Sequence, residues 1–550
     1  MSQSTTLIIG TGLSGLVAAY EITKSGKKVI MLDQENRNNL GGQAFWSFGG
    51  LFFIDSPEQR RLSVKDSFAL ARQDWMGSAA FDRPEDHWPR QWAEAYLKFA
   101  HQEKYDYVKG LGMRFFPIVG WAERGDGKAQ GHGNSVPRFH ITWGTGPGVV
   151  KPFAEHALAM EKQGLLEFRF RHQVNRLELI SEDSIKVFGN QLKEDDSDRG
   201  KESNREVIGT FEFEVNSVVI ASGGIGANLE MVKKQWPARL GTPPERMVCG
   251  VPAYVDGKML QAAEAANVRL INKDRMWHYT EGLENWAPIW PNHGIRILPG
   301  PSSIWLDAFG KRLPAPFYPG FDTLGTLKHI QDTGKSYSWF ILNQSIIKKE
   351  FALSGSEQNP DLTNKDYKLI VKRLFGKKAT APVEAFKEHG KDFIVSNSIE
   401  DLVERMNALS GDGLLELEEV RAIIEARDLE LDNKFSKDFQ VSYLQNTRRY
   451  FGDKIARTAK PHKILDPNHY PLIAVRLNIL TRKTLGGIET NLNGQAFNQS
   501  GECIPNLFAV GEAAGFGGGG MHGYNSLEGT FLGGCIFTGK RVGNYIASSH

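Results

Sequence analysis

The chain has 550 residues, of which 41% are hydrophobic and 24% are charged, and its formal net charge is +2. This length allows roughly two to four domains, and the near-zero charge gives no electrostatic reason to expect nucleic acid or an acidic membrane surface as a partner. The three cysteines, Cys249, Cys503 and Cys535, are far apart and form no C-x-x-C pair, which argues against a disulfide framework or a metal site.

The sequence also contains no apolar run of the ~18 residues that a membrane span requires. The first predicted strand begins at about Thr6, which leaves no room for a signal peptide. We therefore expect a cytoplasmic protein without membrane insertion, and a homo-oligomer is compatible with these features.

The first predicted element is a short apolar strand at residues 6–10, which runs directly into a G-x-G-x-x-G turn. A helix is predicted over 13–24 and a second strand over 28–33, ending in Asp33. Gly10 permits the tight turn, Gly12 lets a pyrophosphate approach the N-terminus of the helix, and Gly15 lets helix and strand pack closely. This unit predicts a dinucleotide site in which Asp33 accepts hydrogen bonds from ribose hydroxyls.

A glycine-rich loop at residues 40–50 follows Asp33 in place of a second βα unit. An extended stretch of this kind suits a flavin, so the loop indicates FAD rather than NAD. Because Trp46, Phe48 and residues 51–53 are too apolar for a surface loop, we expect the loop to be buried against a large flat ligand.

The next part of the chain predicts helices at about 92–111 and 152–163 and strands at 167–178, 184–189 and 206–215. The polar stretch 190–205 between the last two strands is typical of a mobile hairpin tip. A buried parallel strand beginning at Val218 then ends in Ala221, Ser222 and Gly223, small residues that let the backbone pass close to a ligand.

The composition changes at about residue 246 to Trp- and Pro-rich segments, and residues 343–450 are helical and charged. We interpret 246–445 as an inserted α+β substrate-capping domain, which separates two parts of the FAD-binding domain at 1–245 and 446–550. The predicted fold class is α/β, with a Rossmann-like FAD-binding domain and this inserted cap.

The C-terminal part predicts strands at 472–476 and 506–511, a turn at 484–487, and a helix that continues through about Phe537. Glu512 directly follows the second strand and can accept hydrogen bonds from ribityl hydroxyls. The N-terminus of the following helix can face the flavin edge that becomes negative on reduction, which its dipole would stabilise.

These features together resemble the fumarate reductase/succinate dehydrogenase flavoprotein superfamily, which includes the 3-ketosteroid dehydrogenases, and the chain looks most like its bacterial "FAD-binding dehydrogenase" branch. Residues 8–33 look like the FAD fingerprint of that superfamily. Arg138-Phe-His140 with Gly144 and Gly146 resembles its Arg-x-His-x-x-x-Gly-x-Gly loop. Residues 219–224, 484–487 and 511–515 are similar to its other motifs, and 522–540 matches the fumarate reductase tail without a gap.

The resemblance implies an FAD-dependent dehydrogenase that moves a hydride between flavin N5 and a C–C bond next to a carbonyl. Fumarate reductases place a carboxylate-clamping arginine where this chain has Ser526, and two histidines where it has Arg482 and Lys483. Fumarate and succinate are therefore not expected as substrates. Succinate dehydrogenases attach FAD to a histidine in the loop after the first acid, and no histidine lies between Asp33 and Gly50, so we expect noncovalent FAD.

The residues expected at the cofactor come from the two ends of the chain and from the strand that ends near Ala221. They are Gly10, Gly12, Leu13, Ser14, Gly15, Asp33, Gln34, Gly41, Gly42, Gln43, Ser47, Gly49, Gly50, Ala221, Ser222, Gly223, Gly511, Glu512, Asn525, Ser526 and Leu527.

Four residues are candidates for the chemistry. Tyr524, in the glycine-rich stretch that precedes the last helix, could act as a proton donor or acceptor, or be a packing ring with a satisfied hydroxyl. His522 could line the site or be structural. Arg482 and Lys483 could polarise a carbonyl or bind an anion, or form a solvated pair, since adjacent residues point apart on a strand.

The expected partners are a small-molecule substrate and an unknown electron acceptor. The tryptophans of the cap, Trp277, Trp286, Trp290 and Trp305, suggest a bulky apolar, ketosteroid-like substrate, although they could also be core residues. A flavin oxidase or a CH–OH or CH–NH dehydrogenase of the same fold, and a non-enzymatic redox sensor, are the alternatives. The predicted cap favours an enzyme because it implies a closed substrate pocket.

Overall fold

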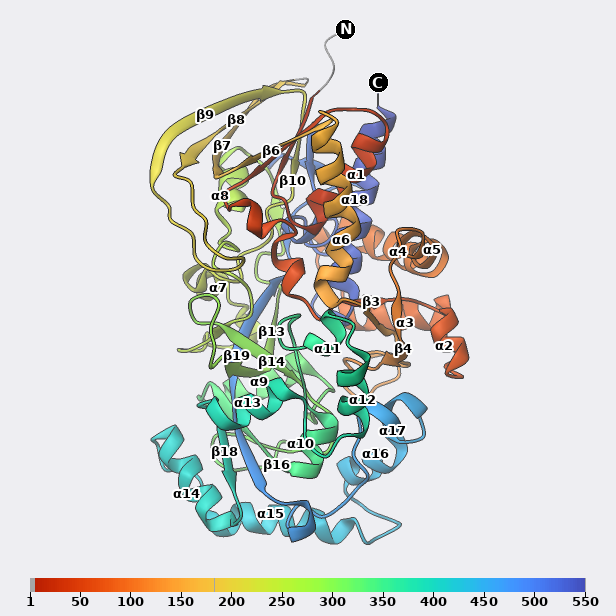
Figure 1. Cartoon of the computed structure of the whole chain (residues 1–550), viewed down its shortest axis with the longest axis vertical. Helices are drawn as coiled ribbons and strands as arrows, with labels where there is room; N and C mark the ends of the chain where they lie inside the picture. The colour runs from red at the N-terminus through yellow and green to blue at the C-terminus, as the bar shows by residue number, and fades with distance from the viewer. Residues whose placement is uncertain (1–4, 183, 550) are drawn as a thin grey trace.

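The computed structural model describes residues 5–182 and 184–549, and the upper half of the molecule in Figure 1 is built around a six-stranded sheet. Five of its strands are parallel, and in the centre Thr6 lies opposite both Val29 and Ser217. The strands predicted at 6–10 and 28–33, from Val218, and at 506–511 are present here, but the strand predicted over 167–178 is interrupted at Arg171 and only its first part belongs to this sheet. From edge to edge the strands are β21 (Gln495–Phe497), β22 (Cys503–Ala509), β10 (Ser217–Ile220), β1 (Thr6–Ile9), β2 (Val29–Asp33) and β6 (Leu166–Phe170).

Three helices lie side by side next to this sheet (Figure 1): α1 (Leu13–Lys24), α6 (Thr145–Lys162) and α18 (Thr530–Ser548). A Cβ atom on Gly539 of α18 would lie 2.5 Å from the carbonyl oxygen of Ser14, so only glycine allows α18 to approach α1 this closely. The close contact places the N-terminal ends of both helices at the same edge of the sheet.

Two predicted helices differ from those observed. α6 begins at Thr145 rather than at about residue 152, after Gly144 with φ of 90°. The helix expected over 92–111 is interrupted at Glu103 and forms α4 (His87–Gln102) and α5 (Lys104–Gly110). The sequence is glycine-rich at the start of α6 and charged between α4 and α5. The spacing of apolar residues therefore does not show where these helices begin or end.

The antiparallel strands β7 (His172–Ser181), β8 (Ser184–Leu192) and β9 (Val207–Val215) form a separate sheet. The polar stretch after β8 is folded back onto the cofactor domain. Arg199 donates a 2.7 Å hydrogen bond to the carbonyl oxygen of Leu40, and the Asn36 amide donates to the carbonyl oxygens of Asp195 and Ser197 at 2.9 Å each.

The lower half of the molecule in Figure 1 is the cap, which is organised around an eight-stranded sheet. Its longest strand, β19 (Leu472–Thr484), pairs with β16 (Tyr337–Asn343) at one end and with β13 (Met276–Glu284) at the other. The sequence suggests that residues 446 onward return to the FAD-binding domain, but β19 lies in the cap sheet. Almost every residue of β19 is buried, and a strand buried on both faces has the same apolar pattern in either sheet.

The other strands of the cap sheet are short, and helices cover the sheet. The strands are β11 (Val248–Cys249), β14 (Gly294–Leu298), β15 (Ile304–Leu306), β17 (Ala352–Leu353) and β18 (Phe393–Ser396). The helices include α9 (Thr323–Asp332), α10 (Gln344–Glu350), α11 (Pro360–Thr363), α12 (Tyr367–Phe375), α13 (Ala381–His389), α14 (Ile399–Ser410), α15 (Leu417–Glu430), α16 (Phe439–Thr447) and α17 (Phe451–Ala456).

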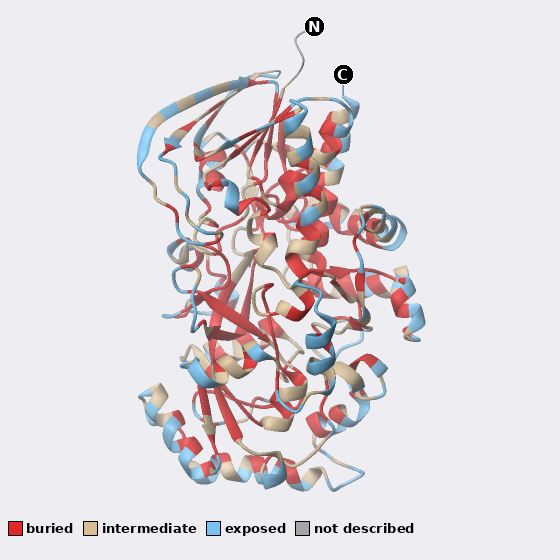
Figure 2. Cartoon of the chain, viewed as in Figure 1, coloured by how far each residue is buried: buried red, intermediate tan, exposed pale blue. Residues whose placement is uncertain are grey.

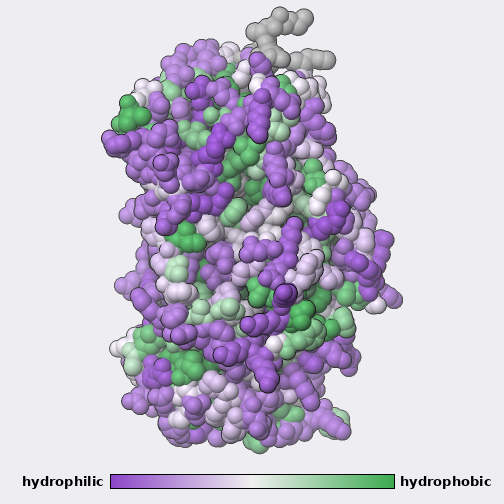
Figure 3. All heavy atoms as spheres, in the orientation of Figure 1, coloured by the Kyte–Doolittle hydropathy of each residue, from purple (hydrophilic) through white to green (hydrophobic). Residues whose placement is uncertain are grey.

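Buried residues follow the strands of both large sheets and the inner sides of the helices (Figure 2). The face shown in Figure 3 is mostly hydrophilic, with separate hydrophobic patches. Within the described part of the chain, no helix combines the length and the apolar composition that crossing a membrane would require.

Candidate active site

A cavity of about 360 Å³ extends from the carboxyl ends of the parallel strands of the six-stranded sheet into the cap. Its wall joins parts of the chain that are remote in sequence, as expected for a ligand site at such a strand edge. Of the residues expected at the cofactor, the cavity is lined by Gly10, Gly12, Leu13, Ser14, Asp33, Gln34, Gly41, Gly42, Gln43, Ser47, Gly49, Gly50, Ala221, Ser222, Gly223 and Glu512.

The glycine turn has the shape that a pyrophosphate requires. A Cβ atom on Gly10 would lie 2.6 Å from the carbonyl oxygen of Ala221, and one on Gly15 would lie 2.3 Å from that of Gly10. A Cβ atom on Gly12, by contrast, would have no heavy atom nearer than 3.9 Å. The turn is therefore closed at Gly10 and Gly15 and open at Gly12, where the N-terminus of α1 favours an anion.

Two buried polar groups of the wall also fit a polar cofactor. Ser222 Oγ and the Tyr254 hydroxyl line the cavity and have no hydrogen-bond partner in the described protein. A buried polar atom without a partner costs free energy, and the hydroxyl, phosphate or ring polar atoms of FAD would supply the missing partners.

Asp33 holds the glycine turn against the end of β2. The backbone N–H and the hydroxyl of Thr11 donate to Asp33 Oδ2 at 2.8 and 2.6 Å, and the N–H of Glu35 donates to Oδ1 at 2.9 Å. The carboxylate still lines the cavity, and its hydrogen bond to a ribose stays a prediction.

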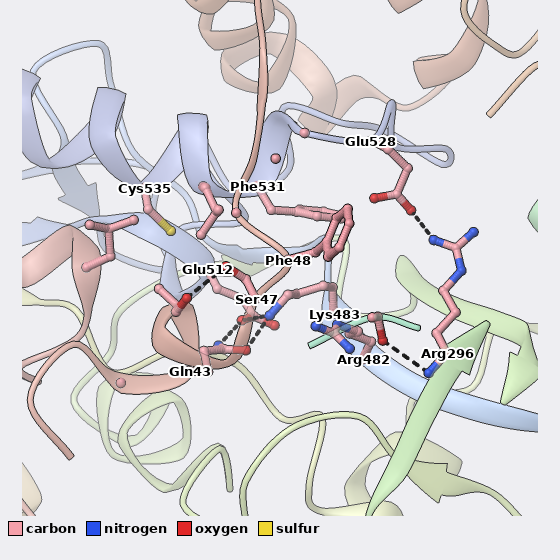
Figure 4. A pocket seen from close by; sticks show the side chains of 18 of the residues that line it. Gln43, Ser47, Phe48, Arg296, Arg482, Lys483, Glu512, Glu528, Phe531 and Cys535 are labelled. Atoms are coloured by element: carbon pink, nitrogen blue, oxygen red, sulfur yellow. Dashed lines mark hydrogen bonds and ion pairs between the residues drawn. The ribbon is translucent and has the colours of Figure 1, made fainter. Parts of the chain in front are cut away.

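Glu512, at the other end of the cofactor region, connects the segment after β22 with the loop of residues 40–50 and with the end of β19 (Figure 4). Its carboxylate accepts a hydrogen bond of 2.5 Å from the Gln43 amide and one of 2.9 Å from the N–H of Thr484. Lys483 Nζ lies 3.6 Å from the same carboxylate and donates to Gln43. Burial lowers the pKa of Lys483, although the charge of Glu512 opposes this effect.

Arg482 and Lys483 both line the cavity although they are adjacent on β19. The pairing of β13 with β19 shifts register between Trp277 and Tyr279, opposite this part of β19, and such an irregularity re-aims side chains. Arg482 makes no side-chain hydrogen bond or ion pair within the part of the protein that the structure describes. Its guanidinium is thus available to a bound molecule.

Tyr279, Arg296 and Glu528 form a connected group in the cavity wall (Figure 4 labels the last two). The Tyr279 hydroxyl donates to Glu528 Oε1 at 2.8 Å, and Arg296 donates to the same oxygen at 2.6 Å. The Arg296 guanidinium carbon also lies 3.7 Å from the centre of the Tyr279 ring. Burial and the neighbouring Glu528 raise the pKa of Tyr279, so its phenol is protonated at neutral pH.

The sequence gives little indication of this group, because its members come from β13, β14 and the turn before α18. Tyr279 and Arg296 carry no motif, and Glu528 lies two residues beyond the position at which the superfamily pattern has its arginine. The carboxylate of Glu123, which also lines the cavity, lies 3.7 Å from the Arg296 guanidinium. Only the pairing of β13 with β14 and the turn before α18 bring these side chains together.

Neither Tyr524 nor His522 lines the cavity. The Tyr524 hydroxyl donates to Asp82 at 2.9 Å, and its ring packs under the guanidinium groups of Arg83, Arg239 and Arg275. His522 is buried 2.9 Å from the Thr530 hydroxyl, and burial lowers its pKa to about 3. The catalytic roles expected for both residues stay predictions, and their surroundings favour structural roles.

The remaining residues that we expected at the cofactor lie behind the cavity wall. A Cβ atom on Gly511 would lie 2.5 Å from Ser14 Oγ, so Gly511, like Gly15, is needed for close packing. The Asn525 amide donates to the carbonyl oxygen of Ser78, Ser526 Oγ lies 3.1 Å from the Thr530 hydroxyl, and Leu527 is in the core.

Arg138 and His140 are also buried away from the cavity. Arg138 forms ion pairs of 2.8 Å with Asp66 and 2.5 Å with Asp74. His140 lies 2.7 Å from Ser56 Oγ, and burial lowers its pKa to about 4. These contacts correspond to a structural role for the Arg-x-His loop.

The four tryptophans that suggested a bulky substrate do not line the cavity. Trp277, Trp290 and Trp305 are buried in the protein interior, and Trp286 is 45% exposed. The apolar part of the cavity wall comes instead from other aromatic and aliphatic residues, such as Phe116, Leu298 and Phe351.

Residues 5–532 match the family model described as FAD binding domain, so the chain belongs to this family of FAD-binding proteins. FAD is its cofactor, and the protein is an FAD-dependent oxidoreductase of the dehydrogenase type. A KsdD-like steroid dehydrogenase of Mycolicibacterium smegmatis is 55% identical over 532 residues, 97% of this chain and 96% of that protein. One of Mycobacterium tuberculosis is 54% identical over 537 residues, 98% of this chain and 94% of that protein.

Solved structures confirm the predicted fold class. The 3-ketosteroid delta1-dehydrogenase of Sterolibacterium denitrificans, in complex with 1,4-androstadiene-3,17-dione, has a TM-score of 0.67 at 14% identity and covers 100% of both chains. A flavocytochrome c3 fumarate reductase has a TM-score of 0.63 at 17% identity, covering 99% of this chain and 78% of that chain. At these identities the likeness shows the fold.

FAD is expected to be released, unmodified, when the purified protein is denatured by acid or heat. The loop that would carry an attachment histidine, residues 40–50, contains none, although it lines the cavity. Absorbance and mass measurement of the supernatant after precipitation check this. Flavin that stays with the denatured chain would contradict it.

Proposed function

We propose that the protein dehydrogenates a C–C bond next to a ketone carbonyl in a bulky apolar molecule of the 3-ketosteroid class. The observation that carries this proposal is that the cofactor residues share one cavity with Tyr279, Arg296, Glu528 and Arg482. The names of the relatives support a steroid ketone as the substrate class.

The part of the cavity wall contributed by the cap and by the strands beside it suits an apolar ring system. It contains Phe116, Trp121, Phe139, Ile141, Leu298 and Phe351. Burying such surface against an apolar substrate contributes roughly 25 cal/mol per Å², and the few polar groups of the wall are left to orient the substrate.

Dehydrogenation removes a hydride and a proton: the hydride would pass to bound FAD from the second carbon of the bond, and the proton of the carbon next to the carbonyl would pass to Glu528, the carboxylate of the cavity wall beside Tyr279. Tyr279 has one O–H, which it donates to Glu528 in the structure. When substrate binds, this O–H would turn to the substrate's carbonyl oxygen, because a protonated, buried phenol donates a strong hydrogen bond to an oxygen that becomes negative. Glu528 would keep its ion pair with Arg296. Glu528 and Arg296 position the phenol by contacting its hydroxyl and its ring.

Arg482 and Lys483 supply positive charge in the same cavity. Arg482, with no partner among the described side chains, is placed to stabilise negative charge that develops on the substrate or on the reduced cofactor. Lys483, through Gln43 and Glu512, holds the loop of residues 40–50 against β19. We regard Lys483 as a positioning residue.

An anaerobic substrate screen tests this function. A 3-ketosteroid with a saturated ring bond next to the carbonyl should bleach the visible flavin absorbance in stoichiometric amounts, and the product should be two mass units lighter than the substrate, about the mass of the two hydrogen atoms removed. Failure of every such ketone, together with bleaching by an alcohol or amine, would favour a different dehydrogenase of the same fold. Fast reoxidation by oxygen alone would favour an oxidase.

Succinate and fumarate are expected to turn over at least ~100-fold more slowly than the ketone, because a charge-assisted carboxylate clamp is missing. Ser526 stands where the superfamily arginine would be, and it is buried behind the cavity wall. Steady-state assays with both acids check this. Turnover of either acid at a rate similar to that of the ketone would show that another cation, such as Arg482, provides the clamp.

A further inference from the structure

The cap end of the cavity carries a group of four basic side chains. Lys348 and Lys349 belong to α10, Arg373 belongs to α12, and Arg457 directly follows α17; all four line the cavity. Figure 1 shows these three helices together in the lower half of the molecule, away from the FAD-binding sheet. We call these four residues the cationic end.

The charges of the cationic end are poorly compensated by the protein. Lys349 Nζ donates to the carbonyl oxygen of Ile455, and Arg457 donates to that of Leu298 at 2.6 Å. Neither of these residues, nor Lys348, forms an ion pair with a carboxylate in residues 5–182 and 184–549. Arg373 alone has one, with Asp361 at 3.0 Å.

Two buried acids act on Arg457, Asp453 and Glu350, but each is already engaged by other groups. Asp453 forms an ion pair of 2.8 Å with Arg124. Glu350 accepts hydrogen bonds from Ser302 and from the N–H of Ala459, and burial raises its pKa. Burial also lowers the pKa of Arg457 to about 10 and lowers those of Lys349 and Arg373. Sheltered cations without counter-charge cost free energy unless an anion joins them.

We propose that the cationic end binds an anionic group, a carboxylate or a sulfate, on the end of the substrate remote from its ketone. This inference rests on the proposed function, because it treats the part of the cavity that lies in the cap as the substrate site. Leu298 lies on β14 two residues after Arg296 and accepts a hydrogen bond from Arg457, so it joins the two parts of the wall. Phe351 and Ile370 add apolar surface to the same wall. The substrate class is thus an apolar ring ketone with an acidic tail.

Three probes test the proposal: 3-oxo-4-androstene-17β-carboxylic acid, its methyl ester, and the 17β-sulfate of the matching alcohol. The holoenzyme should show kcat/KM for the better of the two anions at least about tenfold above that for the ester, since a hydrogen bond to a charged group is worth that factor or more. The preferred anion distinguishes carboxylate from sulfate. Titration calorimetry with the oxidised holoenzyme should show the same order of affinity.

Two variants locate the effect. Lys348→Gln removes a charge that forms no ion pair in the described structure, so no carboxylate is left unpaired. Arg457→Gln removes the most deeply placed charge of the cationic end. Each should lower kcat/KM and affinity for the anion about tenfold and leave the ester within about twofold. Lys372→Gln and Lys454→Gln, exposed on the same helices, are controls that should change neither. Flavin content and Tm show whether each variant is folded.

The proposal would be overturned if wild type used the ester and the anions with equal kcat/KM. It would also be overturned if folded Lys348→Gln lost kcat/KM by the same factor for the ester as for the anions. If no 3-ketosteroid reduces the flavin, the proposed function fails instead. Calorimetry then still decides whether the cationic end prefers the anions, and equal or absent binding of acid, sulfate and ester would overturn it independently.

Discussion

Replacing Tyr279 by phenylalanine is expected to slow reduction of FAD by the ketone substrate by ~100- to 10,000-fold, the usual cost of losing a positioned proton donor. The phenol is buried in the cavity wall, hydrogen-bonded to Glu528 and stacked under Arg296. Removing only the hydroxyl leaves the Arg296–Glu528 ion pair of 2.6 Å in place, so the fold and the FAD content should be kept. The loss should therefore be in the chemical step.

Stopped-flow reduction under anaerobic conditions measures this rate, with FAD content and Tm recorded beside it. Tyr524→Phe is the matched control: Tyr524 is the tyrosine that the sequence predicts as a proton donor or acceptor, but its hydroxyl contacts Asp82 outside the cavity wall. Its reduction rate should stay within a few-fold of wild type. If flavin reduction were slow in Tyr524→Phe and normal in Tyr279→Phe, the catalytic role would belong to Tyr524 instead.

Replacing Glu512 by alanine is expected to weaken FAD binding by roughly ten- to a hundred-fold, because a charged hydrogen-bond acceptor is worth ~1.5–3 kcal/mol. The carboxylate lines the cavity and orders its surroundings, since it accepts hydrogen bonds from Gln43 and from Thr484. Its loss would also leave the half-buried Lys483 without its acidic neighbour. Both effects remove contacts that hold Gln43 and Lys483 in place in the cofactor region.

Titration of the apoprotein with FAD, followed by flavin fluorescence, measures the affinity. Glu502→Ala, a change of the same type at an exposed position preceding the same strand, should leave it unchanged. Unaltered FAD affinity in Glu512→Ala would show that the ribityl chain is bound by other groups.

The sequence by itself determined the cofactor domain, because its recognition elements are local. Strand, glycine turn, helix and acid follow one another within residues 6–33, and each has a steric or electrostatic reason that can be evaluated without knowing the rest of the fold. The same holds for the loop 40–50 and for Glu512, which directly follows a buried strand. These residues indeed line one cavity.

Tertiary structure decided which polar groups share that cavity. Tyr279, Arg296 and Glu528 are brought together by the pairing of β13 with β14 and by the turn before α18, and no spacing along the chain indicates this. Tyr524 and His522 carry the expected pattern but face away, because the glycine-rich turn packs against α3 (Phe68–Ala79): Tyr524 N–H donates to the carbonyl oxygen of Ala79.

The extent of the cap was also decided in three dimensions. β19 is buried on both faces, so its sequence fits either large sheet equally well, and only its register with Met276–Glu284 and Tyr337–Asn343 assigns it to the cap. This pairing places Arg482 and Lys483 at the end of the cap sheet where both line the cavity. A local motif can be recognised because its physics is local, whereas a site assembled from distant strands depends on pairings that a single sequence does not specify.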